Sequence, residues 1–212
     1  MKYKHIIWDW NGTLFNDAWL CVDIINNALA RRNMPTITKQ QHEELFVFPV
    51  IDYYRNLGFD FKKESFEVSG TEFIDEYNQR FREANLHDGV VNILSTIQNL
   101  GISQSVLSAM EQSMLNELIV YFDLSKYFIN VSGLDNHYAH SIIENGIKWM
   151  EELHFGPHEV LLVGDTAHDF EVAKAIGADC LLIPSGHQIK HKLVSTNNKV
   201  ISNLEAVLEE IK

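Results

Sequence analysis

Short apolar strands alternate with helical segments along most of this chain, and this alternation restricts the fold more than any other feature of the sequence. The expected strands span residues 4–10, 102–108, 127–131, 159–163 and 179–183, and the helices expected among the later strands span 89–100, 111–121 and 138–153. Strands that alternate with helices are typical of a parallel sheet that is covered by helices on both faces. We therefore expect an α/β protein.

A long helical stretch interrupts this alternation after the first strand. Apolar residues recur at helical spacing over residues 17–33, and a longer helix is expected over residues 64–85. Between them, Pro49 stands where a helix can begin and Gly58 where it can end. No strand pattern appears between about residues 16 and 86. This span is therefore predicted to form a small helical insertion.

Aspartates follow two apolar strands that lie far apart in the chain. Asp9 ends the first strand and precedes the turn signal Asn11-Gly12, whereas Asp165 ends a later strand and Asp169 falls in the first turn of the next helix. Because the carboxyl ends of parallel strands meet at one edge of a sheet, these carboxylates could hold a hard divalent cation there. Ordinary local structure is the alternative, since aspartate is common in turns and at helix starts.

These segments resemble the motifs of the haloacid dehalogenase superfamily of phosphohydrolases, and within it those of the phosphoglycolate-phosphatase-type enzymes. The residues that match are Asp9, Gly12 and Thr13 in the first motif, and Gly164, Asp165 and Asp169 in the last acidic motif. The motifs occur in the order that the family has, and the resemblance extends over nearly the whole chain.

The resemblance also implies a fold and a domain division. The family's second motif, a strand that ends in Ser or Thr, is matched by a strand ending in Ser108-Ala109. A three-layer, Rossmann-like core with a parallel sheet is expected over residues 1–15 and 87–212. Residues 16–86 are expected to form an all-helical cap domain over the site.

The chemistry that the resemblance implies is hydrolysis of a small phosphorylated metabolite, of the phosphoglycolate type, by a Mg²⁺-dependent phosphatase. Asp9 would attack the phosphorus and form an aspartyl-phosphate that water then hydrolyses. Mg²⁺ would be held by Asp9, Asp165 and the backbone carbonyl of Asn11, with Asp169 in the same acidic motif. The residues expected to bind the phosphoryl oxygens are Gly12, Thr13, Ser108 and Ala109.

Asn11 departs from the family pattern at a position that matters for turnover. In related phosphatases an aspartate there protonates the leaving alkoxide and then takes a proton from the attacking water, and an amide can do neither. Loss of a general acid costs about two to four orders of magnitude in rate. Alkyl phosphates should therefore suffer most, and aryl or acyl phosphates least. The alternative is a catalytically impaired protein that binds metal and phosphate in a regulatory role.

The family's lysine before the last acidic motif has no clear match in this chain. Lys148 is the first lysine of the helix expected from residue 138, and it would lie about 15 Å along that helix. His137 or His140 could substitute for it when protonated. The sequence leaves this position open.

Two further residue pairs allow more than one interpretation. His187 and His191 stand four residues apart, a spacing that can place two imidazoles on one helical face, but no third ligand accompanies them and we do not expect zinc. Tyr53 and Tyr54 could contact the substrate or could pack one cap helix against another.

Composition agrees with a small globular enzyme. The chain has 212 residues, of which 46% are hydrophobic, so it can bury a sizeable core. Its length suits one domain with an insertion or two small domains. A formal net charge of -12 argues against nucleic-acid or anionic-membrane partners. Cys21 and Cys180 are too few for a disulfide framework, and no apolar stretch approaches the length needed to cross a bilayer. We expect a cytoplasmic protein that binds a small phosphorylated metabolite. The sequence indicates neither the physiological substrate nor the oligomeric state.

Overall fold

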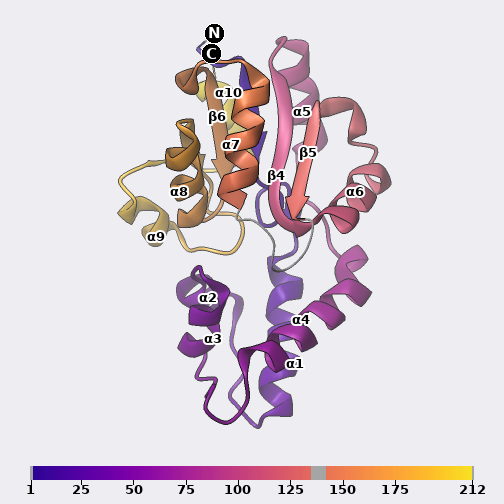
Figure 1. Ribbon diagram of the computed structural model, residues 1–212, viewed down its shortest axis with the longest axis vertical. Coiled ribbons are helices and arrows are strands. Elements are labelled where there is room, and N and C mark those ends of the chain that lie inside the picture. The colour runs from indigo at the N-terminus through magenta and orange to yellow at the C-terminus, as the bar shows by residue number, and fades with distance from the viewer. Residues whose placement is uncertain (1, 135–141, 212) are drawn as a thin grey trace.

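A parallel sheet forms the centre of the computed structural model, which describes residues 2–134 and 142–211. Within these residues the sheet has six strands in the order β5-β4-β1-β6-β7-β8, and all neighbouring strands run parallel (Figure 1). The strands are β1 (His5–Trp8), β4 (Ser103–Glu111), β5 (Asn130–Leu134), β6 (Val160–Gly164), β7 (Asp179–Leu182) and β8 (Lys199–Val200). The predicted parallel α/β sheet is confirmed.

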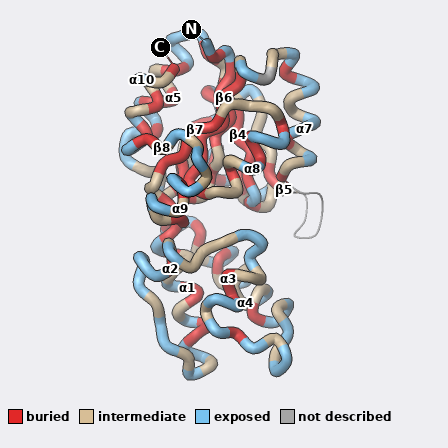
Figure 2. The backbone as a smooth tube through the Cα atoms, turned by 90° about the vertical axis from the view of Figure 1, so that its left-hand side faces the viewer, coloured by how far each residue is buried: buried red, intermediate tan, exposed pale blue. Residues whose placement is uncertain are grey.

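Helices cover both faces of this sheet, as the prediction of a three-layer, Rossmann-like core requires. They are α5 (Val90–Asn99), α6 (Gln112–Tyr121), α7 (Ile142–Leu153), α8 (Ala167–Ile176), α9 (Lys190–Ser195) and α10 (Val207–Glu210). Successive strand residues point to opposite faces, so Ile6 and Trp8 pack with α5 and α6, whereas Ile7 packs with α7 and α8. Figure 2 shows how strongly burial concentrates in the strands.

A helical region lies beyond the carboxyl ends of the strands (Figures 1 and 2). Its helices are α1 (Ala18–Arg31), α2 (Lys39–Leu45), α3 (Val50–Asn56) and α4 (Phe66–Arg80). They enclose a hydrophobic cluster of their own, in which Leu29 of α1 packs with Tyr53 and Tyr54 of α3. The helix that begins after Pro49 and ends before Gly58 is where the sequence places it.

Some short elements differ from the sequence-based expectation. β2 (Phe15–Asn16) and β3 (Asn85–Leu86) form an antiparallel ribbon where the chain enters and leaves the helical region. The helix expected to reach residue 85 ends at Arg80, and the strand expected over 127–131 is β5, three residues later. Two-residue strands such as β2, β3 and β8 are too short to show any periodicity.

None of the helices within the described ranges combines the length and the apolar character that a bilayer-spanning segment needs.

His5 in β1 is a buried histidine at the centre of the sheet. Its Nδ1 lies 2.7 Å from the hydroxyl of Ser103, and its Nε2 lies 2.7 Å from the hydroxyl of Ser105. Burial lowers the pKa of His5 from 6.5 to about 4. The unfolded chain therefore binds more protons than the folded chain between these two pH values, and stability is lost as the pH falls through this interval.

We expect the protonation of His5 to remove up to about 3 kcal/mol of unfolding free energy between pH 6.5 and 4. Urea unfolding at several pH values would measure this loss for the native chain and for His5→Asn, with the exposed His191→Asn as the control. The slope of stability against pH should flatten in His5→Asn alone. Equal slopes in all three proteins would contradict the assignment.

Candidate functional site

The three carboxylates that the sequence singles out come together at one edge of the sheet. Asp9 follows β1 and Asp165 follows β6, and these strands are neighbours in the sheet. The backbone N–H of Asp9 donates to the carbonyl of Val163 at 2.9 Å, which keeps the two strand ends level. Asp169 joins them from the first turn of α8. One carboxylate oxygen of each aspartate lies within 4.8 Å of one oxygen of each of the other two.

This acidic cluster, Asp9 with Asp165 and Asp169, is electrostatically unfavourable without a cation. Burial raises the pKa of Asp9 well above its ordinary value, and the charges of Asp169 and Asp165 raise it further. Burial likewise raises the pKa of Asp165, to about 7. An all-oxygen donor set of this kind suits a hard divalent cation such as Mg²⁺, which would relieve the repulsion.

Asp169 also has a local structural role. Its Oδ2 accepts hydrogen bonds from the backbone N–H of Thr166 at 2.9 Å and from the Thr166 hydroxyl at 2.7 Å. Thr166, rather than Asp165, is therefore the N-cap of α8, and Asp169 completes a capping box. The capping role and the position in the cluster are compatible, because the same hydrogen bonds fix the carboxylate that faces Asp9 and Asp165.

The loop after β7 packs directly against Asp165. The backbone N–H of His187 donates to Oδ2 of Asp165 at 2.5 Å, and the Ser185 hydroxyl donates to the carbonyl of Gly12 at 3.1 Å. A Cβ atom at Gly12 or at Gly186 would lie 2.4 Å or 2.2 Å, respectively, from the same Asp165 oxygen. Only glycine allows these two backbone segments to approach the carboxylate so closely.

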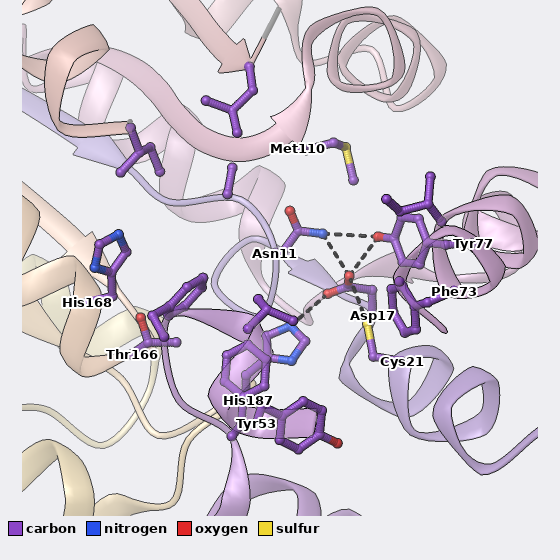
Figure 3. Close-up of a pocket in the computed structure, with 18 of the residues that line it drawn as sticks. Asn11, Asp17, Cys21, Tyr53, Phe73, Tyr77, Met110, Thr166, His168 and His187 are labelled. Carbon is purple, nitrogen blue, oxygen red and sulfur yellow. Dashed lines mark hydrogen bonds and ion pairs between the residues drawn. The ribbon is translucent and has the colours of Figure 1, made fainter. Parts of the chain in front are cut away.

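Asn11 is held by three side-chain hydrogen bonds. Its Nδ2 donates to Oδ2 of Asp17 at 2.7 Å and to the Tyr77 hydroxyl at 3.0 Å (Figure 3). Its Oδ1 accepts from the Ser108 hydroxyl at 3.3 Å. An aspartate at position 11 would therefore place its carboxylate at hydrogen-bond distance from the carboxylate of Asp17. When both groups are ionised, no proton lies between them and they repel each other.

Asp17 is a buried acceptor that the sequence analysis missed. It lies at the start of α1 and also accepts from the Tyr77 hydroxyl at 2.7 Å and the Gly12 N–H at 3.1 Å. Nε2 of His187 lies 3.4 Å from its Oδ1. Although burial alone raises the pKa of Asp17, the hydrogen bond and charge of His187, with the other donors, hold it below its ordinary value. Its sequence position signals only a helix cap, and nothing in the sequence links it to Tyr77 or His187.

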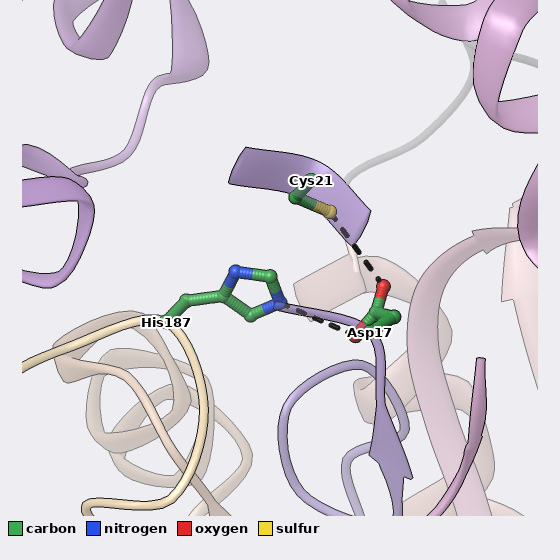
Figure 4. A group of neighbouring side chains, drawn as sticks. All are labelled: Asp17, Cys21 and His187. Carbon is green, nitrogen blue, oxygen red and sulfur yellow. Dashed lines mark hydrogen bonds and ion pairs between the residues drawn. The ribbon is translucent and has the colours of Figure 1, made fainter. Parts of the chain in front are cut away.

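Asp17, Cys21 and His187 form a second group of potential metal ligands, shown in Figure 4. The Cys21 thiol, however, donates to Oδ2 of Asp17 at 3.8 Å. Burial and the charge of Asp17 raise the pKa of this thiol well above its ordinary value, which disfavours the thiolate that a metal requires. We interpret the group as a hydrogen-bonded cluster.

Gly12 and Thr13, two predicted phosphate-binding residues, use their amides inside the turn. The Gly12 N–H donates to the carbonyl of Phe15 at 2.8 Å, and the Thr13 N–H donates to that of Trp10 at 3.3 Å. The Thr13 hydroxyl donates to Oδ1 of Asp165 at 3.3 Å. In this conformation both amides donate within the turn, and the predicted contact of Gly12 and Thr13 with a phosphoryl group stays a prediction.

Ser108 and Ala109 lie near the end of β4, close to Asn11. The Ser108 hydroxyl is buried, accepts from the backbone N–H of Met110 at 3.0 Å and donates to Asn11. Ala109 is exposed and lines a cavity of about 510 Å³ that also reaches Asp9. Their predicted contact with phosphate stays a prediction.

Of the three candidates for the family's lysine, only Lys148 lies among the described residues. Lys148 is exposed on α7 and is not part of the cavity wall. His137 and His140 lie outside the residues that the structure describes. His187 precedes α9, whereas the exposed His191 is within it, so these two histidines do not share one helical face.

The loop that carries His187 also contacts the helical region. Nδ1 of His187 lies 3.1 Å from Nε2 of His42, whose Nδ1 lies 2.7 Å from the Tyr53 hydroxyl. Gln188 and Lys192 each donate to the backbone carbonyl of Phe46 at 3.1 Å. The helical region is thus held over the acidic cluster. Tyr53 both packs in that region and lines the cavity, so its two interpretations do not exclude each other.

Comparison with known proteins points to one family. A model of the haloacid dehalogenase-like hydrolases matches residues 6–183. Tyrosine-protein kinase PtkA of Mycobacterium tuberculosis is 22% identical over 212 residues, which cover 98% of this chain and 70% of that protein. The phosphoglycolate phosphatase of Mesorhizobium japonicum is 21% identical over 218 residues, which cover 100% of this chain and 96% of that enzyme.

Solved structures support the same fold. A haloacid dehalogenase-like family protein from Streptococcus pneumoniae superposes with a TM-score of 0.85 at 15% sequence identity, covering 100% of this chain and 99% of that one. The names of the two relatives specify different reactions, so the similarity alone selects no substrate.

If the acidic cluster holds Mg²⁺, the ion should stabilise the native chain and have little effect on Asp165→Asn. At ten times the dissociation constant the stabilisation would be about 1.4 kcal/mol, or roughly 3–6 °C in melting temperature. Thermal unfolding with and without Mg²⁺ measures this, with the exposed Asp60→Asn as the control. Equal Mg²⁺ shifts in the native chain and Asp165→Asn would contradict the assignment.

Proposed function

We propose that this chain, which belongs to the haloacid dehalogenase-like hydrolase family, is a Mg²⁺-dependent phosphatase that hydrolyses a small phosphorylated metabolite. The observation that carries the proposal is the convergence of Asp9, Asp165 and Asp169 at the floor of the cavity. This convergence supports Asp9 as the nucleophile and the three carboxylates as cation ligands, in a cavity that a phosphate ester would enter.

Asp9 would be the nucleophile in this reaction. Its carboxylate oxygen would form a bond to phosphorus as the bond from phosphorus to the ester oxygen breaks, which gives an aspartyl-phosphate. Water would then cleave that intermediate, release inorganic phosphate and regenerate the carboxylate. Asp9, Asp165, Asp169 and the backbone carbonyl of Asn11 would hold Mg²⁺, which when bound supplies neutralisation of the repulsion between carboxylate and phosphate.

Asn11 would orient rather than transfer a proton. Its amide is held by Asp17, Tyr77 and Ser108, and it has no proton that titrates near neutral pH. Leaving groups that need little protonation should therefore react best. The alternative function, a protein that binds metal and phosphate with little turnover, is favoured by this same residue.

We propose that residues 16–86 act as the cap domain of a core formed by residues 1–15 and 87–212. The separate hydrophobic cluster of the helical region supports this division. A cytoplasmic location suits Cys21 and Cys180, which are both free thiols.

The nucleophile is tested by Asp9→Asn. With Mg²⁺ present, the native chain should release phosphate from 4-nitrophenyl phosphate, and Asp9→Asn should lower kcat by about three orders of magnitude or more. The exposed Asp60→Asn serves as the control. Mass spectrometry of the native protein quenched during turnover should detect phosphate on Asp9. A native chain that binds Mg²⁺ and phosphate but hydrolyses neither this ester nor an acyl phosphate would favour the alternative.

The environment of Asn11 makes a second test possible. Asn11→Asp alone should destabilise the protein. In the native chain Nδ2 of Asn11 donates to Oδ2 of Asp17 at 2.7 Å, and the substitution replaces this hydrogen bond with repulsion between two carboxylates. The double variant Asn11→Asp/Asp17→Asn exchanges the two side chains, so that one hydrogen-bond donor again faces one acceptor. This double variant should raise turnover of alkyl phosphates by about 10²-fold over the native chain. Urea unfolding and kcat/KM measure the two effects. Asn11→Asp as stable as the native chain would contradict the predicted repulsion.

A further inference from the structure

The cavity above the acidic cluster has a predominantly aromatic wall on the side of the helical region. The aromatic residues of this wall include Phe46, Phe48, Tyr53, Phe66, Phe73 and Tyr77. Met110 and Met114 line the cavity from the sheet side. Aromatic and thioether side chains of this kind bind flat apolar groups well.

Part of this wall stands directly beside Asn11. The Tyr77 hydroxyl lies 3.0 Å from Nδ2 of Asn11, and the ring of Phe73 stacks against that of Tyr77 with 5.9 Å between centroids. Figure 3 shows Phe73, Tyr77 and Met110 on one side of Asn11. Phe73 is only half-buried, so its ring is available to a ligand. An ester whose phosphoryl group reaches Asp9 could therefore place its leaving group against this aromatic surface.

Positive charge is scarce around the same space. No lysine or arginine lines the cavity among the described residues, and the sequence of residues 135–141 contains neither. In the part of the chain that the structure describes, the lining histidines are His42, His168 and His187. Burial, with the charge of His187, lowers the pKa of His42 to about 3, and His187 is engaged by Asp17. A carboxylate on the leaving group would thus lose its hydration and face other carboxylates without a guanidinium or ammonium partner.

The side chain of Asn11 independently favours an aromatic leaving group. The amide cannot protonate a departing oxygen. A phenol ionises near pH 10, as tyrosine does, so a phenolate departs without a general acid far more readily than an alkoxide. The cavity wall and the residue beside the reacting oxygen therefore favour the same class of leaving group.

We infer that the substrate is a small phosphate monoester of an uncharged phenol, bound with its phosphoryl group at Asp9 and its aromatic ring against Phe73, Tyr77 and Met110. This inference rests on the proposed phosphatase function. In the reaction the oxygen of Asp9 bonds to phosphorus, the bond from phosphorus to the phenolic oxygen breaks, and the phenolate takes its proton from solvent. Water then releases inorganic phosphate from Asp9.

The decisive experiment compares phosphate release from four esters with the full-length chain and Mg²⁺. Phenyl phosphate carries the proposed leaving group, benzyl phosphate keeps the ring but leaves as an alkoxide, and 4-carboxyphenyl phosphate adds a charge to a phenol. Phosphoglycolate has neither the ring nor the phenolic oxygen. The kcat/KM for phenyl phosphate should exceed that for 4-carboxyphenyl phosphate about tenfold or more, and that for the two alkyl esters by about 10² or more.

Two variants distinguish binding of the ring by the aromatic wall from the reactivity of the leaving group. Acetyl phosphate, which has no ring, is the reference substrate. Phe73→Ala should raise KM for phenyl phosphate about tenfold, and it should lower the ratio of kcat/KM for phenyl phosphate to kcat/KM for acetyl phosphate by a similar factor. Phe61→Ala, also in the helical region but outside the cavity wall, is the matched control. Ile74→Arg places a cation in the wall and should improve 4-carboxyphenyl phosphate about tenfold relative to phenyl phosphate.

The failures of the two proposals are distinguishable. Hydrolysis of neither acetyl phosphate nor any of the esters would overturn the phosphatase function itself. Hydrolysis of acetyl phosphate together with a preference for phosphoglycolate or 4-carboxyphenyl phosphate would overturn only the inferred leaving group. A phosphotyrosyl peptide that surpasses phenyl phosphate by tenfold or more would overturn the assignment to a small substrate.

Discussion

Mutual repulsion among three clustered carboxylates, of which Asp165 and Asp169 are buried and Asp9 is partly buried, is the constraint on which the rest of this structure depends. Asp9, Asp165 and Asp169 would separate if they were free to do so, because burial and like charge both disfavour their ionised forms. The parallel sheet prevents this by ending β1 and β6 at the same edge, and the capping box of α8 fixes the third carboxylate. The fold thus maintains an unfavourable charge arrangement whose natural complement is a divalent cation.

A second buried acid, Asp17, connects this edge to the helical region. It accepts hydrogen bonds from Asn11 and Gly12 in the core and from Tyr77 in α4, and it pairs with His187 from the loop after β7. A single carboxylate therefore positions groups from three separate segments of the chain. Because a buried acceptor that loses a donor is costly, these segments should move as one unit around it.

The departure at Asn11 and the composition of the cavity wall belong together. An amide at this position suits the neighbouring Asp17, which needs a donor, but it removes the group that would protonate an alkoxide. The aromatic wall beside it, formed in part by Phe73 and Tyr77, favours an apolar ring rather than a charged small metabolite. A leaving group that departs without a proton is consistent with both features. The phosphoglycolate-type substrate that the family resemblance implies stays a prediction.

Local patterns in the sequence determined the α/β class, most of the longer helices and strands, and the three aspartates of the acidic cluster. Each of these depends on periodicity or on a residue at the end of an apolar run, which neighbouring residues are sufficient to specify. Only the tertiary structure decided that Tyr77 and His187 meet at Asp17, beside Asn11. Those contacts join residues 60 or more positions apart, such as Tyr77 and Asp17, and no local pattern encodes which distant side chain will meet a buried acceptor.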